Sequence, residues 1–218
     1  MPNYEILKEI TEIMLITHLI ETSHINKRQW HNLHRAMHNF GLDRIGSGAY
    51  SDVYHNPKYG YVVKIFDNFD VNYLAYLEMI SAINNPHFPK VLGKPQTMFE
   101  PFEEYFAVKL EHLEPFNTLN TDTQAVINWM EDPIERFCKK STDMNFDRFL
   151  KFVLAHKDIR GTSLEKQVRE FIKSFPDWNK AIDVLKQVFS TKRGTVVDLL
   201  NNNILNRNSV PVITDPFG

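Results

Sequence analysis

The sequence holds a single cysteine, Cys138, and only 8 glycines among its 218 residues. One cysteine excludes a disulfide within the chain and a cysteine-based zinc site, so we expect Cys138 to be a small buried apolar residue in a reducing compartment. The apolar runs are a few residues long, far short of the roughly 20 residues that span a bilayer. The first eight residues lack the basic start and apolar stretch of a signal peptide. We therefore expect no membrane partner.

The sequence also lacks an excess of either charge: it contains 25 Lys and Arg residues and 27 Asp and Glu residues, which gives a net charge of −2. A general nucleic-acid-binding protein carries a basic excess, so we expect no direct nucleic-acid partner. Apolar residues make up 43% of the chain, which excludes a disordered or low-complexity chain. A chain of this length buries enough apolar surface to fold without a disulfide or a metal.

Apolar residues at helical spacing dominate the first forty positions. They form two stripes: Ile6, Ile10, Ile13 and Ile20, then Trp30, Leu33, Met37 and Phe40. This spacing predicts two helices, and Gly41 is of the residue type that commonly ends a helix. Residues 1–41 are therefore predicted to form an N-terminal helical extension that packs against the rest of the protein.

Short segments rich in Val, Ile, Tyr and Phe follow the extension and predict strands. These segments are 42–45, 53–55, 61–66, 91–93 and 105–110. One helix is predicted at about 71–83, because Asn84-Asn85-Pro86 would end it. Residues 42–113 are thus predicted to form a small antiparallel sheet with one helix.

The remaining residues, 114–218, are predicted to be mainly helical. Three apolar stripes at helical spacing lie within residues 146–189. Segments 204–206 and 210–213 have the pattern of two strands joined by a turn. The predicted fold class is therefore α+β, with N-terminal helices, a small sheet lobe and a reduced helical lobe that ends in a hairpin.

Two glycines, Gly46 and Gly48, lie on either side of Ser47 between two predicted strands. Glycine has no Cβ, so the backbone here can approach a ligand closely and present N–H donors to phosphate oxygens. A tight hairpin alone would also explain both glycines. A dinucleotide-binding loop would not, because a helix follows the glycines in that motif.

A lysine, Lys64, interrupts the apolar strand segment Val62-Val63-Lys64-Ile65. Beside a phosphate-binding hairpin it is a candidate to neutralise phosphate charge. We expect its side chain to be exposed, as strand lysines usually are. Glu78 follows in the predicted helix, and its carboxylate would hold the ammonium group in position. The plainer alternative is a surface pair that contributes under ~1 kcal/mol.

Three further polar residues surround the terminal hairpin. Asp198 and Asn203 lie five residues apart before it, and Asp215 follows its second strand. A carboxylate can accept the proton of a hydroxyl group, and amide and carboxylate oxygens are hard ligands suited to Mg²⁺. The plainer alternative is that these residues cap and turn a loop.

In chain order, these residues resemble the catalytic signature of protein kinases: a glycine-rich hairpin, a strand lysine, a helix glutamate, Asp-x4-Asn-Ile-Leu and a final Asp. The resemblance covers residues 42–218. The end of the chain is similar, more specifically, to the early serine/threonine protein kinases of short-tailed bacteriophages. That similarity lies in Asn203-Ile204-Leu205 and Val210-Pro211-Val212-Ile213-Thr214-Asp215-Pro216.

The resemblance implies ATP and Mg²⁺ as cofactors and a role for each residue of the predicted sheet lobe. Gly46, Ser47 and Gly48 would cover the nucleotide phosphates. Lys64, held by Glu78, would pair with the α- and β-phosphates.

The resemblance also assigns the later residues. Glu111 and Leu113 occupy the positions of the hinge, whose backbone groups bind adenine. Asp198 would be the catalytic base, and Asn203 and Asp215 would hold Mg²⁺. The protein would then be a serine/threonine kinase that phosphorylates host proteins in the bacterial cytoplasm during phage infection.

Several positions depart from the kinase pattern. Ser51 replaces the third glycine of the loop, and Val196-Val197 replaces the His-Arg before the catalytic aspartate. Leu200 replaces the lysine that contacts the γ-phosphate in serine/threonine kinases, and the Asp-Phe-Gly motif reads Asp215-Pro216-Phe217. Because the sequence ends at Gly218, we expect a pared-down domain without an activation segment. The replacement of the arginine by Val197 agrees with this expectation, because that arginine normally binds the phosphorylated residue of an activation segment.

These departures leave two other functions open. A catalytically weak or inactive kinase-like protein would inhibit a host factor by binding it. Phosphotransfer to a small molecule is the other, because the kinase fold hosts that reaction too.

Three histidines, His31, His34 and His38, share one face of the second predicted helix. Their spacing can bind a metal ion. The sequence indicates no fourth ligand, and a solvated or half-buried histidine cluster is the alternative.

Overall fold

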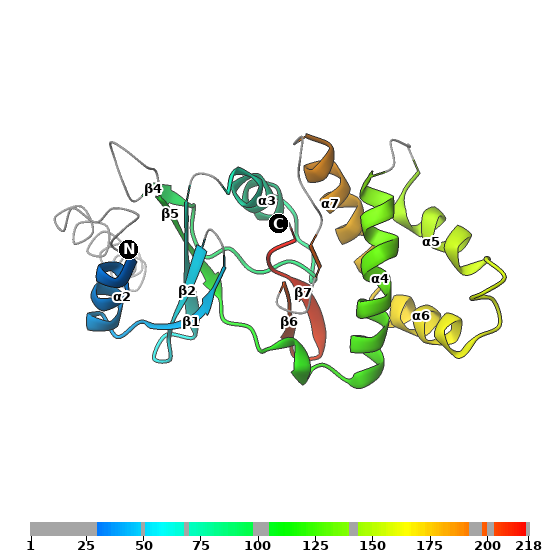
Figure 1. Ribbon diagram of the computed structural model, residues 1–218, viewed down its shortest axis with the longest axis horizontal. Helices are drawn as coiled ribbons and strands as arrows, with labels where there is room; N and C mark the ends of the chain where they lie inside the picture. Colours follow the sequence, from blue (N-terminus) through cyan, green and yellow to red (C-terminus); the bar gives the residue numbers. More distant parts are fainter. Residues whose placement is uncertain are drawn as a thin grey trace, which may run out of the picture. The chain divides into compact units, whose positions relative to one another are not determined.

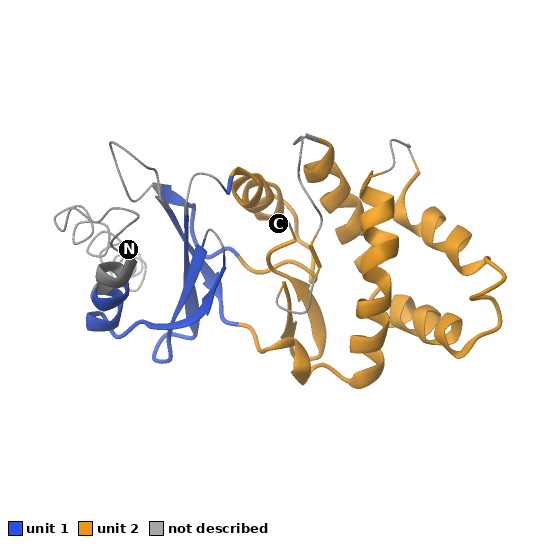
Figure 2. Cartoon of the chain, in the orientation of Figure 1, with its two compact units in different colours: residues 1–70, 91–112 blue, residues 71–90, 113–218 orange. Residues whose placement is uncertain are grey.

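The computed structural model forms two compact units, which Figure 2 shows in two colours. Unit 1 comprises residues 1–70 and 91–112, and unit 2 comprises residues 71–90 and 113–218. The structure describes residues 30–48, 51–67, 70–97, 105–139, 144–191, 198–199 and 203–216. The first predicted helix, which contains Ile6, lies outside the described residues.

Unit 1 is built on a five-stranded antiparallel sheet in the order β1-β2-β3-β5-β4 (Figure 1). The strands are β1 (Asp43–Ser47), β2 (Ser51–Asn56), β3 (Tyr61–Asp67), β4 (Gln96–Thr97) and β5 (Tyr105–Glu111). A β-bulge interrupts β1 between Arg44 and Gly46, where β1 carries one residue more than β2.

The strand predicted at 91–93 is wrong. Val91 forms only an isolated bridge with Leu110, and the short strand β4 begins later, at Gln96. Pro95, which precedes β4, has no N–H group to donate to a sheet. The other four predicted strands appear, each with bounds shifted by a few residues at most.

The helix α2 (Trp30–Asn39) packs on one face of the sheet. Met37 is fully buried there and Phe40 packs beside it. Their partners are Leu42, which precedes β1, and the sheet residues Tyr54, Tyr61, Val63, Ile65 and Ala107. The helix ends as predicted at Gly41, which has φ +70° and donates its amide to the His38 carbonyl oxygen at 2.8 Å. The second N-terminal helix is therefore part of unit 1.

Unit 2 contains most of the helices. They are α3 (Val71–Ser81), η2 (Phe116–Thr118), α4 (Thr121–Lys139), α5 (Phe146–Leu154), α6 (Ser163–Ser174) and α7 (Trp178–Thr191). The helix α4 packs against α5, α6 and α7, and α3 packs against α7. Cys138 is buried in α4 and burial raises its pKa to about 12, which confirms a protonated, apolar cysteine. Among the described helices, none has the length and hydropathy needed to cross a membrane.

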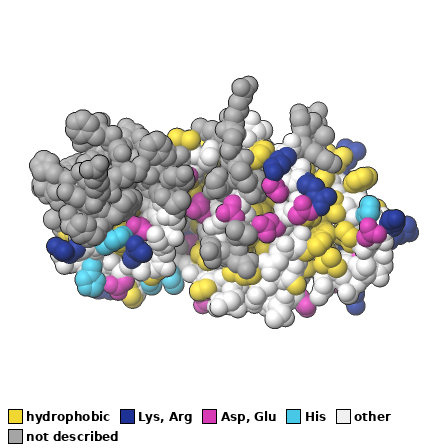
Figure 3. All heavy atoms as spheres, viewed as in Figure 1, with side chains coloured by type: hydrophobic (Ala, Val, Ile, Leu, Met, Phe, Trp, Pro, Cys, Tyr) yellow, Lys and Arg dark blue, Asp and Glu magenta, His cyan; other side chains and the backbone are white. Residues whose placement is uncertain are grey.

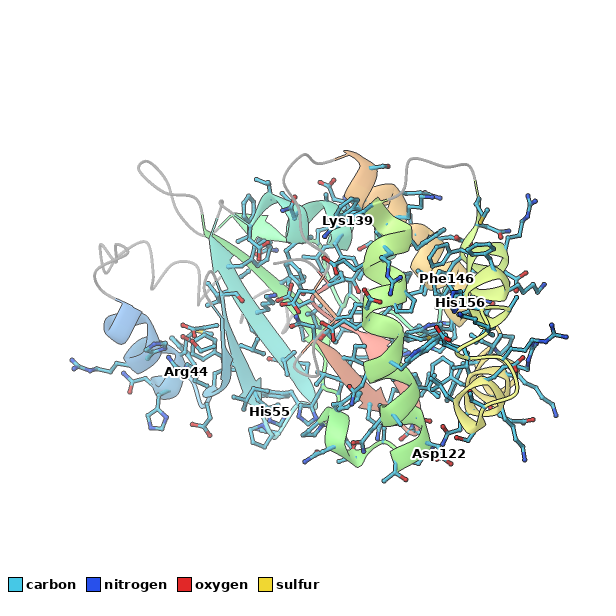
Figure 4. All side chains as sticks on the ribbon, turned by 45° about the vertical axis from the view of Figure 1, so that its right-hand side comes forward. Arg44, His55, Asp122, Lys139, Phe146 and His156 are labelled. Carbon is cyan, nitrogen blue, oxygen red and sulfur yellow. The ribbon has the colours of Figure 1, made fainter. Side chains whose placement is uncertain are left out.

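The helix α4 has no counterpart among the three predicted stripes. It spans 19 residues and includes Pro133, a residue that usually ends or kinks a helix. Its buried face comprises Val126, Ile127, Met130, Ile134, Phe137 and Cys138. Asp122 at one end and Lys139 at the other, both labelled in Figure 4, carry the charges that favour each helix terminus.

A hairpin of β6 (Ile204–Arg207) and β7 (Val210–Ile213) completes unit 2. Its two turn residues, Asn208 and Ser209, both have positive φ, 51° and 71°. Two-residue hairpin turns favour this conformation because its twist matches the twist of the strands. Residue Asn206, which is buried, also accepts the Ser209 amide at its side-chain oxygen.

Segments distant in the sequence hold this hairpin. On β7, the His87 carbonyl oxygen accepts the Ile213 amide at 2.8 Å, and the His87 ring lies 2.8 Å from the Pro211 carbonyl oxygen. On β6, Arg207 donates to the carbonyl oxygens of Pro86 and Phe88. These contacts bind the 86–88 segment to the hairpin.

Residues in and just before η2 also bind the hairpin, at Asn206 of β6. The Asn206 and Glu114 backbones exchange two hydrogen bonds, of 2.8 and 2.9 Å. The Asn206 side-chain amide also donates to Thr118.

These contacts explain a difference from the predicted domain boundaries. Residues 42–113 were predicted to form one lobe, whereas the helix α3 and the 86–88 segment belong to unit 2 with the hairpin. The predicted fold class, α+β with a small antiparallel sheet, a helical part and a terminal hairpin, is confirmed.

We predict that Ser209→Gly stabilises the protein. A side chain with a Cβ is strained at positive φ, and glycine removes that strain at some cost in chain entropy. We expect the free energy of unfolding in urea to rise by about 0.5 kcal/mol. Asn208→Gly is the matched control and should change it less, because asparagine tolerates this conformation. A loss of stability in Ser209→Gly would contradict the strain.

We also predict that His87 makes the protein less stable in acid. Burial lowers the pKa of His87 below its ordinary 6.5, so the folded protein binds fewer protons than the unfolded chain. The free energy of unfolding should therefore fall as the pH falls through 6.5, until the lowered pKa is passed. The measurement is urea unfolding between pH 7.5 and 5.

The matched variant is His87→Asn, whose amide can still donate to the Pro211 carbonyl oxygen. We expect it to be less stable at every pH but to show a shallower dependence on pH. His55, whose pKa is also lowered by burial, contributes equally to both proteins. Equal slopes in the two proteins would show that His87 does not cause the effect.

Candidate functional site

The glycine hairpin and the strand lysine share one face of the sheet in unit 1. Opposite residues run in one row across four strands: Gly46 pairs with Val53, Val53 with Lys64, and Lys64 with Val108. Directly paired residues of antiparallel strands point to the same face. Gly46 and Lys64 therefore lie on one face, opposite the face that α2 covers.

The expectation that Lys64 is exposed is wrong. Its exposed fraction is 4%. All six residues from Tyr61 to Phe66 are buried, so β3 is covered on both of its faces. A buried ammonium group needs polar or charged partners, so this lysine has a different role from a surface lysine that aids solubility.

Neither glycine of the hairpin is required by its own backbone. Gly46 and Gly48 lack the positive φ found at Gly41 and Gly60. A Cβ at Gly46 would lie 3.6 Å from Val53, an ordinary contact, and the Gly48 amide donates to Ser51 at 2.7 Å. The described backbone therefore does not require glycine at either position, and the approach of phosphate oxygens to this hairpin stays a prediction.

The opposite face carries a polar network around His34. Its Nδ1 atom lies 2.6 Å from the Tyr54 hydroxyl, and Arg44 donates to its Nε2 at 3.0 Å. The carboxylate of Asp52, which is buried, lies 3.6 Å from Arg44 and 3.7 Å from His34. Burial and then the charge of Asp52 raise the pKa of Tyr54.

The histidines of α2 therefore contact groups on the sheet. His38 contacts Asp43 at 3.1 Å, and Figure 3 shows histidines beside acidic and basic side chains in this unit. The structure does not describe the side chain of His31. Within the described stretches, no three His, Cys, Asp or Glu side chains are grouped to hold a metal ion.

Unit 2 brings together the three polar residues around the hairpin. The Asn203 side-chain amide donates to the Asp198 carbonyl oxygen at 3.1 Å, and the Asp198 amide donates to the Pro216 carbonyl oxygen at 2.8 Å. The Thr214 amide donates to the Asn203 carbonyl oxygen at 2.8 Å. Asp198, Asn203 and Asp215 are thus adjacent, and each is half-buried.

This arrangement fits a hard cation. With its amide nitrogen directed to Asp198, the side chain of Asn203 has its oxygen left as a ligand atom. The Asp215 carboxylate supplies further oxygens, the donors that Mg²⁺ prefers. Hydrogen bonds hold the backbone of Asp198 and Asn203 and of both neighbours of Asp215, Thr214 and Pro216, while the three polar side chains keep access to solvent.

The remaining predicted site residues lie in separate elements. Glu78 is exposed on α3 in unit 2, whereas Lys64 belongs to unit 1, so their ion pair stays a prediction. Glu111 ends β5 opposite Tyr61, and Leu113 is buried at the start of the second segment of unit 2. Adenine binding by their backbone groups also stays a prediction.

Sequence reasoning missed one residue beside this site. Tyr76 on α3 is fully buried, and its hydroxyl donates to the Ile213 carbonyl oxygen at 2.5 Å. The apolar segment around Tyr76 indicated a helix but gave no sign of this partner. A tyrosine on the buried face of a helix usually finds a hydrogen-bond acceptor, and that rule is the one signal the sequence offered.

No protein-family model matches the chain, and no curated protein matches it at a significant level. Solved structures that match it include "Crystal structure of Rad53 1-466 in complex with AMP-PNP", at 17% identity and a TM-score of 0.32. Another is "Structure of the streptomycin-ATP-APH(2″)-IIa ternary complex", at 15% identity and a TM-score of 0.31.

These matches cover 82% of this chain and 38% of the Rad53 chain, and 89% of this chain and 72% of the second chain. The chain thus spans less than half the length of the Rad53 chain. Because the identities and TM-scores are low, we base the function on the residues of the site.

Proposed function

We propose that the protein transfers a phosphoryl group from ATP to a hydroxyl acceptor. The observation that carries the proposal is the meeting of Asp198, Asn203 and Asp215 in unit 2, through hydrogen bonds of Asp198 and Asn203 to each other and to the two neighbours of Asp215. The row that places Gly46 and Lys64 on one face of the sheet in unit 1 supports it independently. Phosphoryl transfer needs both sets of groups, because catalysis consists of positioning and of charge neutralisation.

The groups of unit 1 are suited to the phosphates of ATP. An ammonium group buried among apolar side chains interacts strongly with a phosphate, because little water screens the two charges. The backbone at Gly46 and Gly48 can approach the same phosphates, since no Cβ stands in the way. Lys64 would then neutralise charge on the phosphates that this backbone covers.

The groups of unit 2 are suited to the acceptor. A hydroxyl group within hydrogen-bond reach of Asp198 would give its proton to that carboxylate as its oxygen attacks the γ-phosphorus. The bond between the γ-phosphorus and the bridging oxygen breaks, and ADP leaves. Mg²⁺ held by Asn203 and Asp215 would supply the positive charge that balances the phosphates. Hydrogen bonds at its amide and carbonyl groups hold the backbone from which this carboxylate extends.

The kinase resemblance extends this proposal to the acceptor. We propose serine or threonine hydroxyls of host proteins in a bacterial cytoplasm during phage infection. A second candidate is a catalytically weak or inactive kinase-like protein that inhibits a host factor by binding. The replacement of the γ-phosphate lysine by Leu200 favours that second candidate.

We predict that Lys64→Met weakens ATP binding at least tenfold. Methionine keeps the apolar stem of the buried lysine but removes the charge, and a hydrogen bond to a charged group contributes about 1.5–3 kcal/mol. Isothermal titration calorimetry with Mg·ATP measures the affinity. Circular dichroism checks that the fold persists.

The matched control is Lys109→Met. Lys109 is the neighbouring buried lysine on β5, but it pairs with Val63, so it lies on the face that α2 covers. Its ammonium group sits 3.6 Å from the centre of the Tyr61 ring. We expect Lys109→Met to bind ATP like the wild type. Equal losses in both variants would show that the effect is structural and would remove Lys64 from the site.

We predict that Asp198→Asn lowers phosphoryl transfer by about a hundredfold or more, because a general base contributes roughly 10²–10⁴ in rate. The measurement is the labelling of bacterial lysate proteins with ATP carrying ³²P at the γ position. Asp122→Asn, an exposed carboxylate at the start of α4, is the control and should label like the wild type.

Two results would separate the candidates. Equal labelling by Asp198→Asn and the wild type would show that Asp198 is not the base. Absence of labelling by a wild type that binds ATP would favour the inhibitory binding protein.

A further inference from the structure

Tyr76 connects the helix α3 to the strand that leads to Asp215. Its side chain is fully buried, and its hydroxyl donates to the Ile213 carbonyl oxygen at 2.5 Å. Ile213 lies two residues before Asp215. Burial, and then the charge of Asp215, raise the pKa of Tyr76, so the phenol keeps its proton and remains a donor.

The accepting carbonyl belongs to a peptide group that is bound at both ends. The Ile213 carbonyl and the Thr214 amide form one planar unit. Tyr76 holds the oxygen of this unit, and the Asn203 carbonyl oxygen accepts its N–H at 2.8 Å. A continuous chain of hydrogen bonds therefore runs from Tyr76 through this peptide to Asn203.

Both proposed metal ligands depend on this peptide. Asn203 is hydrogen-bonded to it, and Asp215 is attached to it through a single residue, Thr214. The Thr214 hydroxyl also donates to the Asn203 carbonyl oxygen, at 3.1 Å. If the peptide rotated, the backbone of Asp215 would turn with it while Asn203 lost a donor. The plane of this peptide therefore controls the separation of the two ligands.

We infer that Tyr76 is a positioning residue for the proposed Mg²⁺ site, because its hydroxyl fixes the peptide that sets Asn203 and Asp215 relative to each other. The inference rests on the proposed function, in which these two residues bind the metal ion. It adds a part of the site that lies on α3, far from both ligands in the sequence.

A packing role for the Tyr76 ring is separable from this role of its hydroxyl. The ring centre lies 5.9 Å from that of Phe88 and 5.9 Å from that of Tyr73. Tyr76→Phe keeps these ring contacts and removes only the hydroxyl. Tyr73→Phe is the matched control, because it removes a phenol oxygen from the same buried helix face without touching the 213–214 peptide.

The experiment measures metal binding and nucleotide binding separately. Mn²⁺ replaces Mg²⁺ as the probe, and electron paramagnetic resonance measures free Mn²⁺ in the presence of ATP. We expect Tyr76→Phe to raise the Mn²⁺ concentration at half-saturation about fivefold, the effect of losing one buried hydrogen bond. ATP affinity in EDTA should equal that of the wild type, because the hydroxyl acts on the metal ligands alone. Tyr73→Phe should match the wild type in both measurements.

Four results would overturn the inference. An unchanged Mn²⁺ midpoint in Tyr76→Phe, or an equal shift in Tyr73→Phe, would do so while the proposed function stands. A parallel loss of ATP affinity in EDTA would show a general structural effect of the hydroxyl. A wild type that binds neither Mn²⁺ nor ATP would remove the proposed function, and the inference with it.

Discussion

The strand β7 depends on hydrogen bonds from outside its own hairpin. A two-stranded hairpin is marginally stable in water, so β6 alone would not keep β7 in place. The missing support comes from the 86–88 segment and from α3, through His87 and Tyr76. Asp198 and Asn203 are bound in turn to the residues that follow β7. The candidate site therefore depends on these long-range contacts, and the same contacts connect α3 to the rest of unit 2.

The sequence predicted the parts of the fold that have a local cause. Apolar alternation and turn residues located four strands of the sheet, and Gly41 correctly ended α2 because positive φ suits glycine. None of the three predicted stripes covered the helix α4, which continues through Pro133 and buries one apolar face. Residues 91–93 were apolar enough for a strand, but their pairing is limited to an isolated bridge between Val91 and Leu110.

The candidate site was predictable in its members but not in its geometry. Residue type and order pointed to Lys64, Asp198, Asn203 and Asp215. The burial of Lys64 was misjudged, although a run of apolar residues on both sides of it is typical of a strand covered on both faces. No periodic pattern records that Tyr76 contacts a carbonyl group 137 residues away. Such contacts depend on the fold as a whole, so the sequence of either segment alone does not contain them.

The bulge in β1 has a consequence for how this hairpin can vary. Arg44 pairs with Tyr54, but the next pair is Gly46 with Val53, so Ile45 is an extra residue. In a regular ladder without the bulge, Ile45 would pair with Val53 and Gly46 with Asp52, which would put Gly46 on the face that α2 covers. Successive residues of a strand alternate between the two faces of the sheet. A shift of one residue in the pairing of β1 with β2 would exchange the two faces of β1, whereas a shift of two residues would preserve them. The extra residue of the bulge, Ile45, thus decides on which face of the sheet the backbone of Gly46 lies.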